Sequence, residues 1–325
     1  MTGPVALPPL RPGRRITGMA AVLLPFDDTG AVDWDALAAG VERTAAAGLV
    51  PAVNMDTGYG PALDTSARAR VLAVTAAALA GAEPAPGWTF VAGAHVDDPS
   101  PAFSAGAHRA ALAEVAAAGW VPILFPSAGL AGLADGAVAD AHAAVAPAVD
   151  RLLAFELGRQ FHPEGRIWSL ATFTAVLDIP QVVGAKHSSL DRVPEWRRLA
   201  VRDERRPDFL VLTGNDLAID MVRWGSDYLL GLATFAPEAF ACRDRLWAAG
   251  DARALAVDDA LQALGAVAFR PPVPAYRHDA ALVWRQRGWA ATARVHPDCP
   301  TRRDGEADLL EALVRRLDEV VGGTG

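Results

Sequence analysis

The sequence predicts an α/β protein: a (β/α)8 barrel, the TIM-barrel fold, with a C-terminal helical appendage. Two observations predict it. Apolar, strand-like runs alternate with helical patterns eight times, and one unit recurs in which a helix ends in glycine before an apolar strand. That unit appears at 46–51, at 117–122 and, as a variant, at 223–231. A doubly wound sheet is the alternative, but no glycine-rich phosphate-binding turn follows the first strand.

The expected elements follow from apolar periodicity and turn signals. Strands are expected at 17–24, 49–55, 88–95, 120–125, 149–156, 181–186, 208–213 and 227–232. Helices are expected at 33–47, 65–81, 104–118, 136–147, 168–178, 194–203, 215–224 and 235–249, the first of them capped by Asp33. After residue 250 the alternation stops, and 252–268, 275–287 and 305–322 are predicted to be helices. The predicted organisation is a flexible arm at 1–15, a barrel at 16–250 and a helical region at 251–325.

Composition narrows the class of protein. The chain has 325 residues, of which 52% are hydrophobic and 21% charged, and its net charge is −8. That balance argues against nucleic-acid binding. No stretch resembles a signal peptide or a membrane span, and two cysteines cannot form a disulfide framework. We therefore expect a cytoplasmic protein without nucleic-acid or membrane partners.

One basic residue stands apart from all the others. Lys and Arg together number 30, and Lys186 is the only lysine. Arginine keeps its proton at any physiological pH and cannot attack a carbonyl, whereas a desolvated lysine amine can. The alternative is a surface lysine left by compositional drift. The barrel prediction favours chemistry, because Lys186 falls at the end of the sixth strand, where barrels carry their catalytic groups.

The other strand ends supply further candidates. The loop 54–60 after the second strand is the richest: glycines let the backbone approach a carboxylate, and Asp56 or Tyr59 could relay a proton. His95 and Asp97 follow the third strand, but two ligands without a third are a weak metal site. His187 is expected to face a helix or a loop and not the substrate. Glu156 and Arg159 are expected either to form an ion pair at the rim or to hold an acidic substrate. The remaining candidates at strand ends are Phe155, Gly214, Leu230 and Gly231.

These residues resemble a known family, the dihydrodipicolinate synthases and N-acetylneuraminate lyases, which are Schiff-base aldolases of class I. The resemblance runs from Thr17 to the C-terminal region. It rests on 24–33, on Asp56-Thr57-Gly58, and most of all on 183–189, which is similar to the family's lysine strand Gly-Ile-Lys-Asp-Ser-Ser. It implies an imine between Lys186 and a 2-oxo acid, typically pyruvate, whose carboxylate meets Thr57 and Gly58. It also implies a homodimer or homotetramer.

The chain departs from the family pattern at its proton-transfer groups. Phe155 stands where strand five usually ends in a tyrosine that shuttles protons, and the tyrosine pair after strand four is missing. In the strand-two loop, usually Gly-Thr-Thr-Gly-Glu, Asp56 replaces a threonine and Tyr59 replaces the glutamate. We hypothesise that Tyr59 or Asp56 takes over proton transfer.

The predicted function is therefore a carbon–carbon lyase of the aldolase type, acting on pyruvate or another 2-oxo acid through an imine on Lys186. The predicted site comprises Lys186, Asp56 and Tyr59 for catalysis, and Thr57, Gly58, Phe155, Gly214, Leu230 and Gly231 for substrate binding. No metal or organic cofactor is expected, because the imine acts as the electron sink. Two alternatives remain open: an imine-dependent dehydratase of a sugar-derived 2-oxo acid, and a barrel that binds a 2-oxo acid without turning it over.

Overall fold

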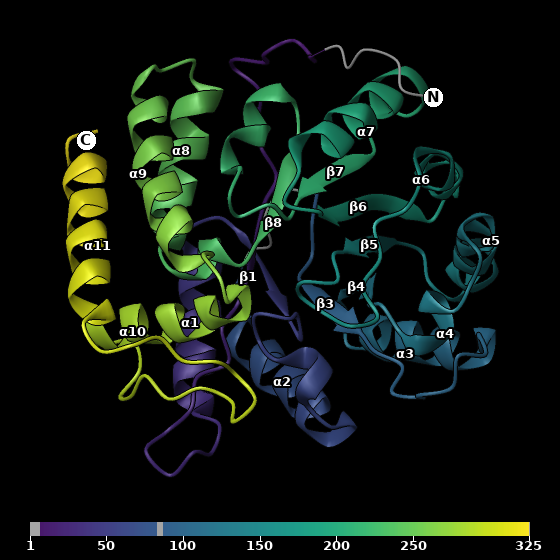
Figure 1. Cartoon of the computed structure of the whole chain (residues 1–325), viewed down its shortest axis with the longest axis horizontal. Helices are drawn as coiled ribbons and strands as arrows, with labels where there is room; N and C mark the ends of the chain where they lie inside the picture. Colours follow the sequence, from purple (N-terminus) through teal and green to yellow (C-terminus); the bar gives the residue numbers. More distant parts are fainter. Residues whose placement is uncertain (1–6, 83–86, 325) are drawn as a thin grey trace. The chain divides into compact units, whose positions relative to one another are not determined.

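A computed structural model describes residues 7–82 and 87–324 and has the predicted fold. Eight strands close into one barrel in the order of the chain (Figure 1). They are β1 (Gly18–Ala21), β2 (Val50–Val53), β3 (Val91–Ala94), β4 (Val121–Leu124), β5 (Leu152–Leu157), β6 (Val182–Ser188), β7 (Leu210–Thr213) and β8 (Asp227–Leu230). Each strand lies at its predicted place. Most are shorter than predicted, because the flanking apolar residues leave the regular strand pairing.

The helices also follow the prediction, with two differences. They are α1 (Trp34–Ala46), α2 (Thr65–Ala78), α3 (Ala105–Ala117), α4 (Ala128–Ala131), α5 (Asp135–Val145), α6 (Leu170–Leu177), α7 (Arg192–Arg205), α8 (Pro237–Ala248), α9 (Arg253–Ala268), α10 (Tyr276–Gln286) and α11 (Glu306–Gly322). The short α4 was not predicted. The helix predicted at 215–224 is wrong in type: a 3-10 helix spans Ile219–Trp224, because the preceding residues form a turn in which the Asn215 side chain accepts the Leu217 N–H at 3.1 Å.

The helix ends follow the local chemistry that the sequence indicates. The Asp33 carboxylate accepts the Ala36 N–H at 3.0 Å and so caps α1. Gly48, Gly119 and Gly225 stand between a helix and the next strand with φ of 91°, 84° and 109°, a conformation that favours glycine. These caps explain why the recurring helix–glycine–strand unit is visible in the sequence.

The chain divides into two compact units. Unit 1 comprises residues 91–228 with the described part of 1–11, and unit 2 comprises the described residues of 12–90 and 229–324. The predicted boundaries at 15/16 and 250/251 stay a prediction, and residues 1–6 of the expected arm lie outside the described residues. Arg11, from the same arm, is docked within unit 1: its guanidinium pairs with Asp203 at 2.5 Å.

In unit 1 the register of β5 and β6 positions the lysine. Phe155 pairs with Lys186, Glu156 with His187, and Leu157 with Ser188. Successive side chains of a strand point to opposite sides. Phe155 and Lys186 therefore share one side of the strand pair, while Glu156 and His187 share the other.

In unit 2, β1 and β2 run parallel, and the C-terminal helices pack on one another, with α9 beside α11 and α10 against α11 (Figure 1). The Trp284 ring of α10 packs on Gly40 of α1, where an added Cβ would lie 2.3 Å from the ring. Trp284 also donates its indole N–H to the Thr234 carbonyl oxygen at 2.9 Å. Among the residues described, no helix has both the length and the apolar character that crossing a bilayer requires.

Candidate active site

The predicted site residues fall in both units, and each group is described within its own unit. In unit 1, Lys186 is 4% exposed and lies near the end of β6. Its ammonium nitrogen Nζ lies 4.5 Å from the centre of the Phe155 ring. The run Val182-Val183-Gly184-Ala185 before it is apolar and partly β-branched, which favours a strand buried on both faces. The lysine is thus a buried amine against an aromatic face.

Aromatic rings continue the wall beyond Phe155. Phe125 meets Phe155 edge to face at 5.1 Å, and the His95 ring stacks on Phe125 at 4.3 Å. None of these three rings carries a phenol, so Phe155, Phe125 and His95 supply no tyrosine hydroxyl for proton transfer. In the part of the chain that the structure describes, no three His, Cys, Asp or Glu side chains gather as metal ligands, at His95 and Asp97 or elsewhere.

Gly214, after β7, leaves the space that the lysine chain uses. A Cβ at this position would lie 2.8 Å from Lys186 Cε and 2.0 Å from Ser188 Oγ. Ser188 follows Lys186 by two residues on β6, so it shares the same side of the strand. Its hydroxyl is buried and has no hydrogen-bond partner among the described residues. A buried hydroxyl without a partner is uncommon and marks Ser188 as a candidate ligand-binding residue.

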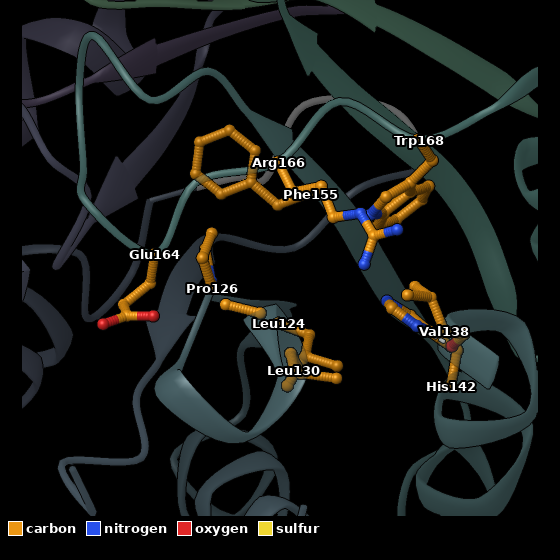
Figure 2. A pocket seen from close by; sticks show the side chains of 10 residues that line it. Leu124, Pro126, Leu130, Val138, His142, Phe155, Glu164, Arg166 and Trp168 are labelled. Atoms are coloured by element: carbon orange, nitrogen blue, oxygen red, sulfur yellow. Dashed lines mark hydrogen bonds between the residues drawn. The ribbon is translucent and has the colours of Figure 1, made fainter. Parts of the chain in front are cut away.

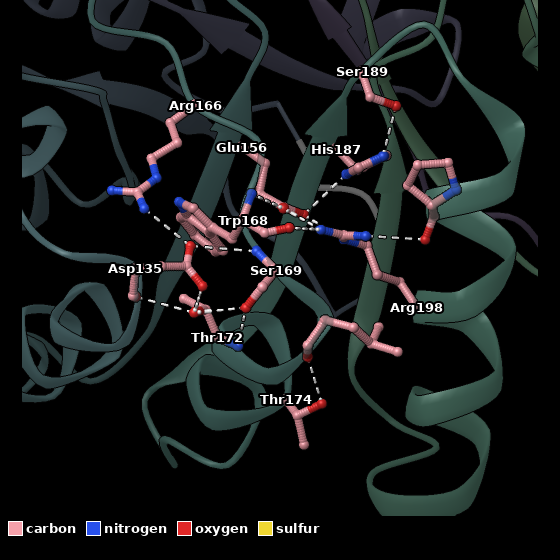
Figure 3. A network of polar contacts seen from close by, with 12 residues as sticks. Asp135, Glu156, Arg166, Trp168, Ser169, Thr172, Thr174, His187, Ser189 and Arg198 are labelled. Atoms are coloured by element: carbon pink, nitrogen blue, oxygen red, sulfur yellow. Dashed lines mark hydrogen bonds and ion pairs between the residues drawn. The ribbon is translucent and has the colours of Figure 1, made fainter. Parts of the chain in front are cut away.

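The opposite side of β5 and β6 faces α7 and is densely paired (Figure 3). The Glu156 carboxylate accepts hydrogen bonds from Trp168 N at 3.0 Å, from His187 Nδ1 at 2.9 Å, and from Arg198 Nε and Nη2 at 2.7 and 2.5 Å. Glu156 is fully buried. Burial by itself raises the pKa of this carboxyl, but the charge of Arg198 and the hydrogen bonds of Arg198 and His187 outweigh burial and lower it to about 2.

This network corrects one expectation and confirms another. Glu156 pairs with Arg198 of α7 and does not form the rim pair expected with Arg159, which is exposed. His187 does face the helix side, as predicted. The Ser189 hydroxyl lies 2.8 Å from His187 Nε2, which gives the serine–histidine–carboxylate connectivity of a hydrolase. The same hydroxyl also contacts the Asp191 N–H and carbonyl oxygen at 3.1 and 3.0 Å, so the serine closes a turn.

In unit 2 the loop after β2 forms a chain of hydroxyl groups that ends on a carboxylate. The Tyr276 hydroxyl donates to Asp56 Oδ2 at 3.0 Å and lies 2.9 Å from Thr57 Oγ1. Arg277, the next residue of α10, donates to the Asp56 carbonyl oxygen at 3.2 Å. Gly231 makes room for this contact, since a Cβ there would lie 2.9 Å from the Tyr276 ring and 3.1 Å from Thr57 Oγ1.

The two other predicted binding residues of unit 2 have packing roles that the structure makes visible. A Cβ at Gly58 would lie 3.1 Å from the Val22 carbonyl oxygen, so a side chain here would force the loop away from the end of β1. Leu230 is fully buried as the last residue of β8.

Tyr59 is enclosed. Its ring stacks on His296 at 5.5 Å, meets Phe26 edge to face at 5.6 Å and lies under the Arg277 guanidinium at 4.8 Å. Burial and the neighbouring Cys299 thiol raise the pKa of the phenol well above 10, against the opposing effect of Arg277. Its φ of 58° is a costly conformation for a residue with a side chain, so this packing holds it in place.

The sequence did not single out Tyr276, Ser188 or Arg198. Tyr276 lies 219 residues from Thr57 and Arg198 lies 42 from Glu156, so no local pattern joins them. Ser188 stood within the recognised lysine motif, and its period-two spacing from Lys186 was the signal that could have identified it.

No family model matches the chain, and no curated protein matches it. Solved structures do match. A dihydrodipicolinate synthase from Thermotoga maritima is 16% identical at a TM-score of 0.76, covering 94% of this chain and 99% of its own. A pyruvate-bound, chloride-inhibited dihydrodipicolinate synthase from Acinetobacter baumannii is 18% identical at 0.75, with coverages of 94% and 99%.

A third structure is a catalytic lysine mutant of the sialic acid aldolase from Ruminococcus gnavus. It is 13% identical at a TM-score of 0.76, covering 96% of this chain and 98% of its own. These likenesses confirm the fold that the resemblance implied, over nearly the whole chain.

Proposed function

We propose that the protein is a Schiff-base lyase of the aldolase type that acts on pyruvate or another 2-oxo acid through an imine on Lys186. The observation that carries the proposal is the position of this lysine. The chain's only lysine lies near the end of β6, buried against Phe155 and beside the space that Gly214 leaves. The fold likeness to a pyruvate-bound synthase and to an aldolase with a catalytic lysine supports it.

The proposed chemistry begins when the neutral Lys186 amine attacks the keto carbon. Water leaves and a protonated imine forms, which withdraws electrons from the neighbouring carbon. Loss of a C3 proton gives an enamine, and a carbon–carbon bond forms or breaks at C3. Hydrolysis returns the amine. We propose that no metal or organic cofactor takes part, because the protonated imine supplies the electron sink.

For the proton transfers we propose Asp56, connected through Tyr276 to Thr57. A carboxylate at the end of two hydroxyl groups can accept and return a proton along hydrogen bonds. Tyr59, the other predicted relay, is the weaker candidate, because its raised pKa and enclosed ring oppose proton exchange. Phe155 supplies no proton at the strand-five position, so the proposal places this task on the strand-two loop.

Borohydride trapping tests the proposal. The protein is incubated with pyruvate, or with each of a panel of 2-oxo acids, then reduced and analysed by peptide mass spectrometry. We expect an adduct of the mass of the reduced oxo acid on Lys186, absent in Lys186→Arg. If no oxo acid gave an adduct, both enzyme hypotheses would be refuted. Only the third alternative would remain, a barrel that binds a 2-oxo acid without turning it over.

Solvent exchange tests the proton relay without knowledge of a second substrate. In D2O the C3 protons of pyruvate exchange each time the enamine forms, and NMR measures the rate. We expect Asp56→Asn and Tyr276→Phe to slow exchange by about 10²-fold or more while the adduct still forms. Tyr59→Phe removes the same hydroxyl from a second buried tyrosine and serves as the matched control. If only Tyr59→Phe slowed the exchange, Tyr59 and not Asp56 would be the proton-transfer group.

We further propose, from the same resemblance, that the protein acts as a homodimer or homotetramer and, from the sequence, that it acts in the cytoplasm. Light scattering coupled to size-exclusion chromatography measures the assembly directly. A monomer at micromolar concentration would contradict this part of the proposal.

A further inference from the structure

The cavity beside Phe155 in unit 1 is too small to hold an organic ligand (Figure 2). Its volume of about 20 Å3 has room for about one water molecule. Glu164 and Arg166 line it together with apolar side chains. A much larger cavity lies within unit 2.

The cavity in unit 2 has a volume of about 430 Å3 and is partly open to solvent. Small-molecule sites typically measure about 300 to 1,000 Å3, so this cavity has the size of a ligand site. Its walls come from α8, from Trp88, from the segment that enters β1 (15–18) and from the turn between α1 and β2 (47–50). Because Gly18 and Val50 are the first residues of β1 and β2, the cavity lies at the amino ends of these strands.

One face of α8 forms a wall of the cavity. Four residues of the helix line it at spacings of three and four, which place them on the same face: Ala241, Asp244, Arg245 and Ala248. The Gly13 N–H donates to the Trp247 carbonyl oxygen at 3.1 Å and so holds the segment before β1 against the end of α8. The walls are therefore fixed by regular secondary structure and by a hydrogen bond to it.

The buried part of the lining is apolar. Its buried side chains are Ile16, Leu49, Val50, Trp88 and Ala241. The indole of Trp88 is the largest of them, and aromatic rings pack favourably on one another. An apolar ring is the group that this part of the cavity fits.

The charged groups of the lining differ in whether they are paired. Arg15 and Arg245 are exposed, and neither guanidinium has an ion pair or a hydrogen bond among the residues that the structure describes. The Asp244 carboxylate, in contrast, accepts a hydrogen bond from Arg243 Nε at 2.6 Å, and Arg243 also pairs with Asp258 at 2.5 Å. Three guanidinium groups thus stand against two carboxylates, which leaves a net positive charge beside the apolar lining.

We propose that this cavity binds a small carboxylate that carries a single aromatic ring, with the ring against Trp88 and the carboxylate at Arg15 and Arg245. A guanidinium matches a carboxylate with paired N–H donors, and the apolar lining removes the ring from water. The Asp56 loop follows the carboxyl end of β2, whereas the cavity lies at its amino end. The site is therefore separate from the proposed proton relay, and it does not depend on imine chemistry.

Isothermal titration calorimetry with 3-phenylpropanoate tests the ligand class. This probe has no keto group and cannot form an imine on Lys186. We expect a Kd of about 0.1 to 1 mM. Binding should be at least about fivefold weaker for 3-phenylpropanamide, which lacks the charge, and for propanoate, which lacks the ring. Equal affinity for either analogue, or no saturable binding of 3-phenylpropanoate, would overturn the proposal.

A charge variant tests the role of the arginines. Arg245→Gln removes one unpaired guanidinium from the wall and should raise the Kd of 3-phenylpropanoate about three- to tenfold. Arg315→Gln is the matched control, because it removes an exposed arginine of α11 that does not line the cavity. An equal Kd in the two variants would contradict a carboxylate at Arg245.

A blocking variant localises the site. Ala248 lines the cavity at the end of α8, so Ala248→Trp places an indole in it and should raise the Kd at least about tenfold. Ala249→Trp is the matched control, since Ala249 is also exposed but lies outside the lining. An unchanged Kd in a folded Ala248→Trp protein would refute the assignment, and so would a matching rise in Ala249→Trp.

Lys186→Arg separates this site from the proposed catalytic one. The proposed function predicts that this variant forms no imine adduct, whereas 3-phenylpropanoate should bind it with the same Kd as the unmodified protein. Loss of binding in a folded Lys186→Arg protein would mean that the probe occupies the catalytic site, and the assignment to the unit 2 cavity would be wrong.

Discussion

The two sides of the β5–β6 strand pair differ in their polar groups: one side carries a hydrogen-bonded ionic network, and the other carries Lys186 and a hydroxyl unpartnered among the described residues. On the helix-facing side, Glu156 accepts four hydrogen bonds from three residues, and the Arg198 guanidinium balances its charge. On the other side, Lys186 lies against aromatic rings beside the Ser188 hydroxyl, which has no hydrogen-bond partner in the described chain. A closed polar network stabilises one geometry, whereas a buried hydroxyl without a partner, as at Ser188, indicates a candidate binding residue.

The helix-facing side, with its hydrogen-bonded Glu156 and His187, also holds the register of the two strands. Because Glu156 and His187 are themselves cross-strand partners, their hydrogen bond holds the register that sets Phe155 opposite Lys186. Arg198 then joins β5 to α7 through Glu156. The helix-facing side is thus expected to govern stability, and the lysine side to govern chemistry.

Lys186→Arg makes the largest expected change, and it affects only the lysine side. Arginine keeps the positive charge but cannot form the imine, so kcat should fall by at least about 10³-fold. The larger guanidinium overpacks the buried space beside Gly214 and should lower the free energy of unfolding by about 1 to 3 kcal/mol. The rate of pyruvate C3 exchange in D2O at saturating pyruvate and urea unfolding measure the two effects. A variant that keeps a tenth of the activity would refute the role of this amine.

Glu156→Gln removes the carboxylate at the centre of the helix-facing network. It leaves the Arg198 guanidinium buried without its counter-charge, which should lower the free energy of unfolding by about 3 to 5 kcal/mol. Urea unfolding at pH 7 measures this. The matched control is Asp178→Asn, which removes the carboxylate of an exposed pair with Arg205 and should lower it by less than about 1 kcal/mol. Equal losses of unfolding free energy in both variants would show that the buried ion pair stabilises the protein no more than an exposed one.

How much of this could be predicted from the sequence differs between the two sides. The eight strands, the place of Lys186 and the side on which His187 lies follow from alternation and period-two spacing, which are local patterns. The partner of Glu156 could not be predicted in this way. Arg159, three residues along the chain, was the nearest basic candidate, whereas the actual partner comes from α7.

The same limit applies to Tyr276 and to the segment 215–224. Tyr276 reaches Asp56 from a helix that follows the barrel, so only the folded chain brings the two together. The segment 215–224 has helical periodicity, but the Asn215 side chain competes for a backbone N–H at its start and a 3-10 helix results. Local sequence patterns contain no information on contacts between residues far apart in the chain. They also do not show where a side chain competes for a backbone hydrogen bond.

The buried His142, whose ring meets Trp168, gives the protein a pH dependence of stability. Its folded pKa of about 4 lies below the 6.5 of an unfolded chain, so between these pH values the unfolded state binds more protons. Stability should therefore fall as the pH drops from about 6.5 to about 4, by about 3 kcal/mol. His142→Phe should remove most of this loss. Unfolding at pH 8 and pH 4.5 measures it, and the difference between the variants at pH 8 corrects for packing. An unchanged pH dependence would contradict the neutral, buried imidazole.

The smallest expected change compares two adjacent serines. Ser188→Ala removes a buried hydroxyl that has no partner, so the free energy of unfolding should stay equal or rise by about 1 kcal/mol. Ser189→Ala removes the hydroxyl bonded to His187 and to the turn, and should lower it by about 1 kcal/mol. If Ser188 binds substrate, its variant should also raise KM, and Ser189→Ala should not. A loss of stability in Ser188→Ala equal to that in Ser189→Ala would mean that both hydroxyls serve the fold, and the contrast between the two sides would then rest on the lysine alone.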